Sequence, residues 1–136
     1  MKRLLAVDDE LGVLQALSES LATKGYEVVT TDRPDDALRL FRDQTFDLVL
    51  LDLQMPGKNG FELYREFGSV REVPVLFVSG YSRLFSPTSP GFSDLWTGQF
   101  SLGRTDILYK PFTLASLFEK VEALIGSSEV TADGIR

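Results

Sequence analysis

The chain has 136 residues, 43% of them hydrophobic and 25% charged, which is ordinary for one globular domain and too short for two. With 14 basic and 20 acidic residues the net charge is −6 and no Lys/Arg cluster stands out, so direct nucleic-acid binding is not expected. The absence of cysteine and histidine excludes disulfides, thiolate metal sites and Ser-His-Asp hydrolases, and with no membrane-length apolar stretch it favours a cytoplasmic protein that contacts no membrane.

Two strand–helix units begin the chain. Residues 4–7 form a short apolar run, typical of a buried parallel strand, and three acids follow it. Leucines then recur at three- and four-residue steps from Leu11, which predicts an amphipathic helix that Gly25 ends. Residues 26–31 are predicted to be a second strand, and Pro34 is placed to open a second helix, where its missing N–H does no harm.

The third strand leads to the residue on which the functional prediction depends. Residues 48–51 are apolar and too few for a helix, which favours a strand buried on both faces, and Asp52 follows directly. A loop with Pro56 and two glycines comes next, and Asn59 is placed to cap a third helix. Open α/β sheets bind ligands where their strands emerge, so we predict that Asp52 is the reactive group.

The second half of the chain continues the alternation. The third helix is expected to bury Leu63 and Phe67, and residues 73–78 and 107–109 are predicted to be the fourth and fifth strands. Thr113 is placed to cap a last helix. The apolar stripe of that helix is predicted to contain Leu114, Leu117, Phe118, Val121, Leu124 and Ile125.

One segment interrupts this pattern. Tyr81 to Gly103 should contain the fourth helix, yet it holds two prolines, three glycines and many serines, so we expect that helix to be short or irregular. The segment also carries the aromatic residues Phe85, Phe92, Trp96 and Phe100. We favour the interpretation that these side chains cover the sheet in place of a helix; the alternative is an exposed surface for a partner.

Strands that alternate with helices predict an α/β fold, with a five-stranded parallel sheet covered by helices on both faces. We assign residues 1–126 to one domain and residues 127–136, which are polar and without pattern, to a C-terminal tail.

Polar residues follow several predicted strands, where they would share one edge of the sheet: Asp8, Asp9, Asp52, Ser79 and Lys110. Three neighbouring carboxylates repel one another unless a cation joins them, and an all-oxygen site favours Mg²⁺. Asp52 would then be the nucleophile that forms an aspartyl phosphate, while Lys110 and Ser79 would contact phosphoryl oxygens. Each residue alone is more simply a cap, a turn residue or a solvated charge, so the prediction depends on the joint pattern.

The same residues make the chain resemble the receiver domain of two-component response regulators, in its chemotaxis-regulator-like form. The resemblance covers residues 2–125 and rests on DDE at Asp8–Glu10, LDLQMPGKNG around Asp52, SGY at Ser79–Tyr81 and KPF at Lys110–Phe112. It implies a flavodoxin-like three-layer sandwich and a conformational switch rather than an enzyme, apart from catalysis of its own phosphorylation and dephosphorylation. The implied metal ligands are Asp8, Asp9, Asp52 and the backbone carbonyl of Gln54.

The resemblance further implies that Asp52 takes phosphate from a phosphohistidine of a sensor histidine kinase or a histidine phosphotransfer protein. Ser79 and Lys110 would sense the phosphoryl group, and the Lys110–Pro111 peptide would be cis. Whether the protein forms a homodimer or belongs to a larger protein is left open, and the irregular fourth helix resembles receivers attached to hybrid sensor kinases.

Some positions depart from the family's pattern and support other functions. Ile107 stands where the family often has an aromatic switch residue, which is an argument for a pseudo-receiver that binds proteins without phosphorylation, whereas the complete set of acids, Ser79 and Lys110 argues against that alternative. Tyr81 is bulky and is expected to slow dephosphorylation. A Mg²⁺-dependent phosphohydrolase is a third class, but it usually has a second acid where this chain has Gln54.

Overall fold

The computed structural model describes residues 1–55, 60–80 and 105–126. Its five strands form one parallel sheet in the order β2-β1-β3-β4-β5. The strands are β1 (Arg3–Val7), β2 (Glu27–Thr31), β3 (Leu48–Leu51), β4 (Val75–Gly80) and β5 (Thr105–Lys110). The helices within the described residues are α1 (Leu11–Ala22), α2 (Pro34–Asp43), α3 (Gly60–Val70) and α5 (Leu114–Ile125).

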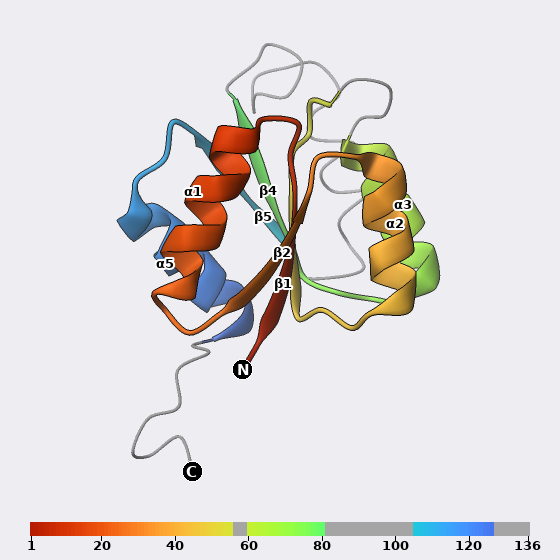
Figure 1. The fold of residues 1–136 in the computed structure, drawn as a ribbon, viewed down its shortest axis with the longest axis horizontal. Coiled ribbons are helices and arrows are strands. Elements are labelled where there is room, and N and C mark those ends of the chain that lie inside the picture. Colours follow the sequence, from red (N-terminus) through yellow and green to blue (C-terminus); the bar gives the residue numbers. More distant parts are fainter. Residues whose placement is uncertain (56–59, 81–104, 127–136) are drawn as a thin grey trace.

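The helices cover both faces of the sheet, α1 and α5 on one side and α2 and α3 on the other (Figure 1). Alternate strand residues point to opposite faces, so each strand contributes to both cores. The core against α2 and α3 includes the strand residues Leu5, Val7, Val49, Leu51, Val75 and Phe77. The core against α1 and α5 includes Leu4, Leu48, Leu50, Leu76, Val78 and Leu108. This is the predicted flavodoxin-like three-layer α/β sandwich.

Several local predictions are confirmed. Pro34 is the first residue of α2, and the Thr113 side chain caps α5 by accepting a hydrogen bond from the Ser116 N–H at 3.0 Å. The first helix ends earlier than predicted, at Ala22, and Gly25 follows three residues later with a φ of 87°, a backbone conformation that glycine adopts without strain. The Lys110–Pro111 peptide is cis.

The predicted boundaries of the strands were less accurate. β4 runs from Val75 to Gly80 and not over residues 73–78, because Pro74 has no N–H to give to the neighbouring strand. β5 extends beyond residues 107–109 at both ends, and β2 begins at Glu27 instead of Tyr26.

Two helical leucines do not belong to the buried stripes in which they were predicted. Leu11 and Leu114 are the first residues of α1 and α5, and they are 68% and 52% exposed. Their periodic spacing matches the stripe, but each is the first residue of its helix, where the stripe ends and the side chain is exposed.

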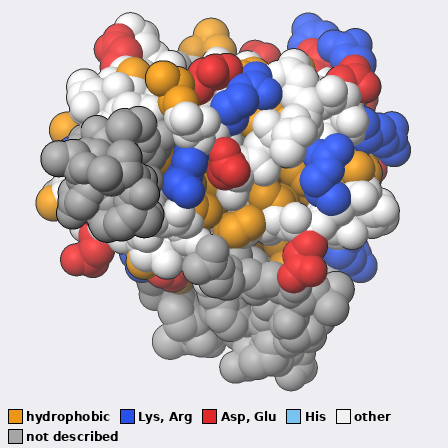
Figure 2. All heavy atoms as spheres, turned by 90° about the horizontal axis from the view of Figure 1, so that it is seen from below, with side chains coloured by type: hydrophobic (Ala, Val, Ile, Leu, Met, Phe, Trp, Pro, Cys, Tyr) orange, Lys and Arg blue, Asp and Glu red, His pale blue; other side chains and the backbone are white. Residues whose placement is uncertain are grey.

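The end of the sheet where the strands begin carries acidic and basic side chains close together (Figure 2). At the start of β1, the Arg3 side chain forms an ion pair of 2.8 Å with Glu27 and donates a hydrogen bond to Gln44. Charges of both signs alternate there, in agreement with the lack of a basic cluster in the sequence.

Three predictions concern residues outside the described ranges: Asn59 as the cap of α3, the irregular segment from Tyr81 to Gly103, and the tail of residues 127–136. In the parts of the chain that are described, no helix has both the length and the apolar character needed to cross a membrane.

Candidate functional site

The pairing of the strands brings the predicted site residues to one edge of the sheet. β1 and β3 are neighbours with Val7 opposite Leu51, so Asp8 and Asp52 leave the sheet next to each other. The chain turns from β1 to α1 on one face and from β3 to α3 on the other, and open α/β sheets bind ligands at such a reversal. Ser79 and Lys110 are in the last two residues of β4 and β5.

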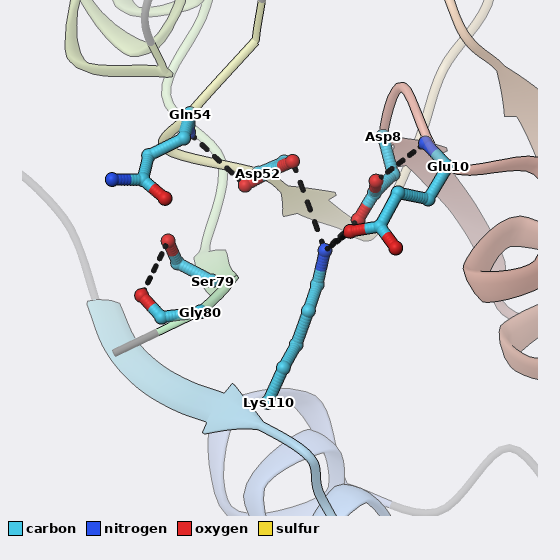
Figure 3. Close-up of polar contacts among 7 residues, drawn as sticks. All are labelled: Asp8, Glu10, Asp52, Gln54, Ser79, Gly80 and Lys110. Atoms are coloured by element: carbon cyan, nitrogen blue, oxygen red, sulfur yellow. Dashed lines mark hydrogen bonds and ion pairs between the residues drawn. The ribbon is translucent and has the colours of Figure 1, made fainter. Parts of the chain in front are cut away.

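The ammonium group of Lys110 lies among three carboxylates (Figure 3). Its Nζ is 2.9 Å from Asp8 Oδ2, 3.0 Å from Glu10 Oε1 and 3.7 Å from Asp52 Oδ2. The side chains of Asp8 and Asp52 are only 2% and 4% exposed. Buried acids this close are stable only with a compensating charge, and Lys110 supplies one positive charge for both of them.

Each of these two acids has one oxygen bound to the backbone and the other directed at Lys110. Asp52 Oδ1 accepts a hydrogen bond of 3.0 Å from the Gln54 N–H, and Asp8 Oδ1 accepts one of 2.9 Å from the Glu10 N–H. These bonds, two residues ahead along the chain, are the local turns that aspartate forms readily. They fix the orientation of the two carboxylates, so that both Oδ2 atoms face Lys110.

Lys110 does not fully compensate the negative charge of the two buried acids. The pKa of Asp52 is raised to about 7, mainly because the group is buried and also because it lies beside the charge of Asp8, although the Gln54 N–H and Lys110 act in the opposite direction. Burial also raises the pKa of Asp8. Burial alone would lower the pKa of Lys110, but its hydrogen bonds to Asp8 and Glu10 outweigh that and raise it. The site is therefore short of positive charge.

The donor atoms suit a hard cation. Carboxylate oxygens of Asp8, Asp9 and Glu10 all lie within 4.8 Å of one another, and the side chain of Asp9 also contacts Asp52. Oxygen donors of this kind are those that Mg²⁺ prefers, and the exposed positions of Asp9 and Glu10 leave room for retained waters. Of the predicted ligands, Gln54 is placed beside Asp52 through its N–H group.

Ser79 is completely buried at the end of β4. Its Oγ is 3.4 Å from the Gly80 carbonyl oxygen, a long hydrogen bond, so the hydroxyl can turn to a better acceptor. In Figure 3, Ser79 and Gln54 lie on one side of Asp52, and Asp8 and Glu10 lie on the other.

Ile107 lies apart from this group. It is paired with Phe77 in the sheet and packs against the core under α2 and α3. The position at which the family often has an aromatic switch residue thus holds a partly buried aliphatic side chain.

The sequence did not reveal the part played by Glu10. The DDE run was recognised, but only Asp8 and Asp9 were assigned a role, whereas the structure places the Glu10 carboxylate on Lys110. The contact joins residues that are 100 positions apart in the chain, so no local sequence pattern predicts it.

Gly60 lets α3 begin directly against the backbone that follows Asp52. Its N–H donates to the Leu53 carbonyl at 3.0 Å. A Cβ atom at this position would lie 2.8 Å from Leu53 Cα and closer still to the Asp52 carbonyl oxygen. Only glycine fits this contact without a shift of the chain that carries Asp52.

The comparisons with known proteins agree with this geometry. The family model of the response regulator receiver domain matches residues 4–122. The chain is 30% identical over 130 residues to the response regulator RR06 of Streptococcus pneumoniae, covering 96% of this chain and 56% of the relative. It is 31% identical over 135 residues to the transcriptional regulatory protein CpxR homolog of Haemophilus influenzae, covering 99% and 55%. The chain thus spans about half the length of the curated relatives it matches.

Solved structures give the same result. The response regulator TrrA of Thermotoga maritima, in complex with Mg²⁺-BeF, superimposes with a TM-score of 0.75 at 33% identity, covering 91% of this chain and 99% of that one. A CheY-like receiver domain protein of Methanospirillum hungatei has a TM-score of 0.78 at 27% identity, covering 90% and 92%. The family match over most of the chain, together with this fold and site, shows that the protein belongs to the receiver domain family of two-component response regulators.

Proposed function

We propose that this chain is a phosphorylation-dependent switch in which Asp52 accepts a phosphoryl group from a phosphohistidine of a partner protein. The observation that carries the proposal is the pair of buried carboxylates, Asp8 and Asp52, that share the ammonium of Lys110. The sequence contains no histidine, so the donor histidine lies outside it. A sensor histidine kinase or a histidine phosphotransfer protein in the cytoplasm would supply it.

The geometry of Asp52 suits an in-line transfer. Its Oδ1 is held by the Gln54 N–H, which leaves Oδ2 as the attacking atom. The new P–O bond forms as the P–N bond of the phosphohistidine breaks, and the electron pair of that bond stays on the imidazole, which takes a proton from solvent. Lys110, which already faces Oδ2, would neutralise one phosphoryl oxygen, and the Ser79 hydroxyl would donate to another.

Mg²⁺ would be held by Asp8, Asp9, Asp52 and the backbone carbonyl of Gln54, and it would supply positive charge to the phosphoryl oxygens. Asp8 and Asp9 belong to a group of carboxylates whose oxygens lie within 4.8 Å of one another, Asp9 also contacts Asp52, and the uncompensated negative charge favours binding of a cation. The relative TrrA has been solved in complex with Mg²⁺-BeF, which supports a Mg²⁺ site in this chain.

The test is incubation of the purified chain with Mg²⁺ and acetyl phosphate, followed by intact-mass measurement. We expect one phosphate adduct on the wild type and on Asp32→Asn, which removes an acid just after the neighbouring strand β2. Asp52→Ala, or removal of Mg²⁺ by EDTA, should abolish the adduct.

A wild type that gains no phosphate at any Mg²⁺ concentration would contradict the proposal. It would favour the alternative of a pseudo-receiver that binds its partners without phosphorylation, for which Ile107 is the structural argument.

A further inference from the structure

Glu10 contacts the central lysine of the site, yet the proposed function gives it no task. The distance from Lys110 Nζ to Glu10 Oε1 is 3.0 Å, nearly equal to the 2.9 Å to Asp8 and shorter than the 3.7 Å to Asp52. The ammonium is therefore drawn to the Asp8 and Glu10 side of the site and away from the phosphoacceptor (Figure 3).

The backbone of Glu10 is fixed by the residues around it. Its N–H donates to Asp8 Oδ1 at 2.9 Å, and its carbonyl accepts hydrogen bonds of 3.1 Å from the Val13 and Leu14 N–H groups. The start of α1 is thereby tied to the acid that also holds Lys110. The backbone of Glu10 is therefore fixed, and only its side chain is free to bind either the first turn of α1 or Lys110.

Glu10 is also an unfavourable residue for its position in the helix. It is the N-cap of α1, where Ser, Thr, Asp or Asn would bind a free N–H of the first turn, and its side chain makes no such bond. The carboxylate reaches to Lys110 instead. A residue that departs from the local preference of a helix and makes a contact across the fold is a candidate for a functional role.

We infer that Glu10 is a positioning residue that holds the Lys110 ammonium in the resting form of the switch. The inference rests on the proposed function, because phosphorylation of Asp52 would have to exchange the Lys110–Glu10 ion pair for a contact between Lys110 and the phosphoryl group. Glu10 thus opposes the phosphorylated form. Glu10 also shares the ammonium with Asp8, which lies 2.9 Å from Lys110 Nζ and would have to give up part of this contact to bind a cation.

Removal of the Glu10 charge should therefore change the affinity for Mg²⁺ and the affinity for a phosphoryl analogue in opposite directions. In Glu10→Gln, Lys110 would form a stronger ion pair with Asp8, and the site would lose one negative charge. Mg²⁺ should therefore bind more weakly. Once a phosphoryl group is present, Lys110 would have no competing partner, so a phosphoryl analogue should bind more tightly. Partly exposed ion pairs of this kind correspond to changes of about two- to five-fold in an equilibrium constant.

The experiment measures both affinities on the whole chain by titration of amide chemical shifts. Mg²⁺ is titrated first, and beryllofluoride, which mimics the phosphoryl group, is then titrated at saturating Mg²⁺. We expect Glu10→Gln to weaken Mg²⁺ binding and tighten beryllofluoride binding, each about two- to five-fold. Asp32→Asn loses the same charge after the neighbouring strand β2, and it should change neither affinity by as much as two-fold.

A second variant separates the contact from the net charge. Glu10→Asp keeps the charge but shortens the side chain, and aspartate at an N-cap binds its own helix. It should also tighten beryllofluoride binding, and it should raise the melting temperature.

The outcomes distinguish the inference from the function on which it rests. If the wild type binds beryllofluoride and Glu10→Gln binds it equally or more weakly, the inference fails and the proposed function stands. An effect of the same size in Asp32→Asn would reduce the result to general electrostatics and would also overturn the inference. A wild type that does not bind beryllofluoride at all contradicts the proposed function itself.

Discussion

Asp52 is a carboxylate in an environment that disfavours its charge. It is 4% exposed, it lies beside Asp8, and its contact with Lys110 is longer than the contact that Asp8 makes. These conditions raise its pKa from an ordinary value of 3.8 to about 7. Without a bound cation, the ionised site is a source of instability, and a cation that joins the carboxylates removes it.

This residue therefore predicts how the stability of the metal-free protein changes with pH. The folded state binds the Asp52 proton more tightly than the unfolded state does, so protonation of Asp52 stabilises the fold. This contribution to the free energy of unfolding is fully present below pH 4 and is lost as the pH rises through 7. Asp52→Asn has no group that ionises at this position, so the variant does not lose this stability as the pH rises. At pH 8 in EDTA the variant should have a free energy of unfolding about 1–4 kcal/mol above that of the wild type.

Urea unfolding at several pH values checks this prediction. The difference between variant and wild type should shrink between pH 8 and pH 4, and saturating Mg²⁺ should reduce it at pH 8. A difference that does not depend on pH would show that Asp52 titrates in the folded protein as it does in the unfolded chain.

At the scale of the elements, the site depends on how closely α3 approaches the end of β3. Gly60, the first residue of α3, contacts the backbone of Asp52 and Leu53, whereas Gly68 later in the same helix has nothing within 4 Å of its potential Cβ. The two glycines thus form a natural pair for comparison. One is required by a close approach, and the other only loosens the helix.

We expect opposite effects from the same substitution at these two glycines. Gly60→Ala should lower the free energy of unfolding by about 1–3 kcal/mol, because the chain has to move to admit the methyl group. It should also reduce the yield of the phosphate adduct, since the moving chain carries Asp52. Gly68→Ala should raise the free energy of unfolding by about 0.5–1 kcal/mol and leave the adduct unchanged.

Denaturant unfolding and intact mass of both variants provide the measurement. Equal stability of the two variants would mean that α3 can shift away from Asp52 without cost.

At the scale of the molecule, the C-terminal helix is connected to the first half of the chain. Tyr26 is 4% exposed before β2, and its hydroxyl donates to the Gly126 carbonyl at 2.9 Å, across 100 residues of sequence. Gly126 ends α5, whose buried residues complete the core against α1. The hydrogen bond therefore fixes the end of a helix that could otherwise fray.

Loss of this bond should affect the whole fold and the end of α5 in particular. Tyr26→Phe should lower the free energy of unfolding by about 0.5–1.5 kcal/mol and speed amide hydrogen exchange in the last turn of α5. Leu114→Ala, at the opposite and exposed end of this helix, should change stability by less than about 0.5 kcal/mol. If the two variants were equally stable, the bond would contribute nothing to the fold.

Local patterns predicted most of the architecture because they depend on nearby residues alone. The apolar run of β3, the proline that opens α2 and the threonine that caps α5 each lie in a few consecutive residues. Strand ends were misplaced because they depend on pairing with other strands, as Pro74 shows before β4. The exposure of Leu11 and Leu114 depends on what packs against the first turn of each helix, and periodicity does not contain that information.

The sequence by itself determined the residue types of the site and their positions after strands, since parallel strands in such a fold end at one edge. Only the tertiary structure decided how those residues share charge. The register of β1 on β3 sets Asp8 beside Asp52, and the ammonium of Lys110 rests between Asp8 and Glu10. The contacts of Lys110 join residues about 100 positions apart, and their strength depends on distance and burial, which exist only once the chain has folded.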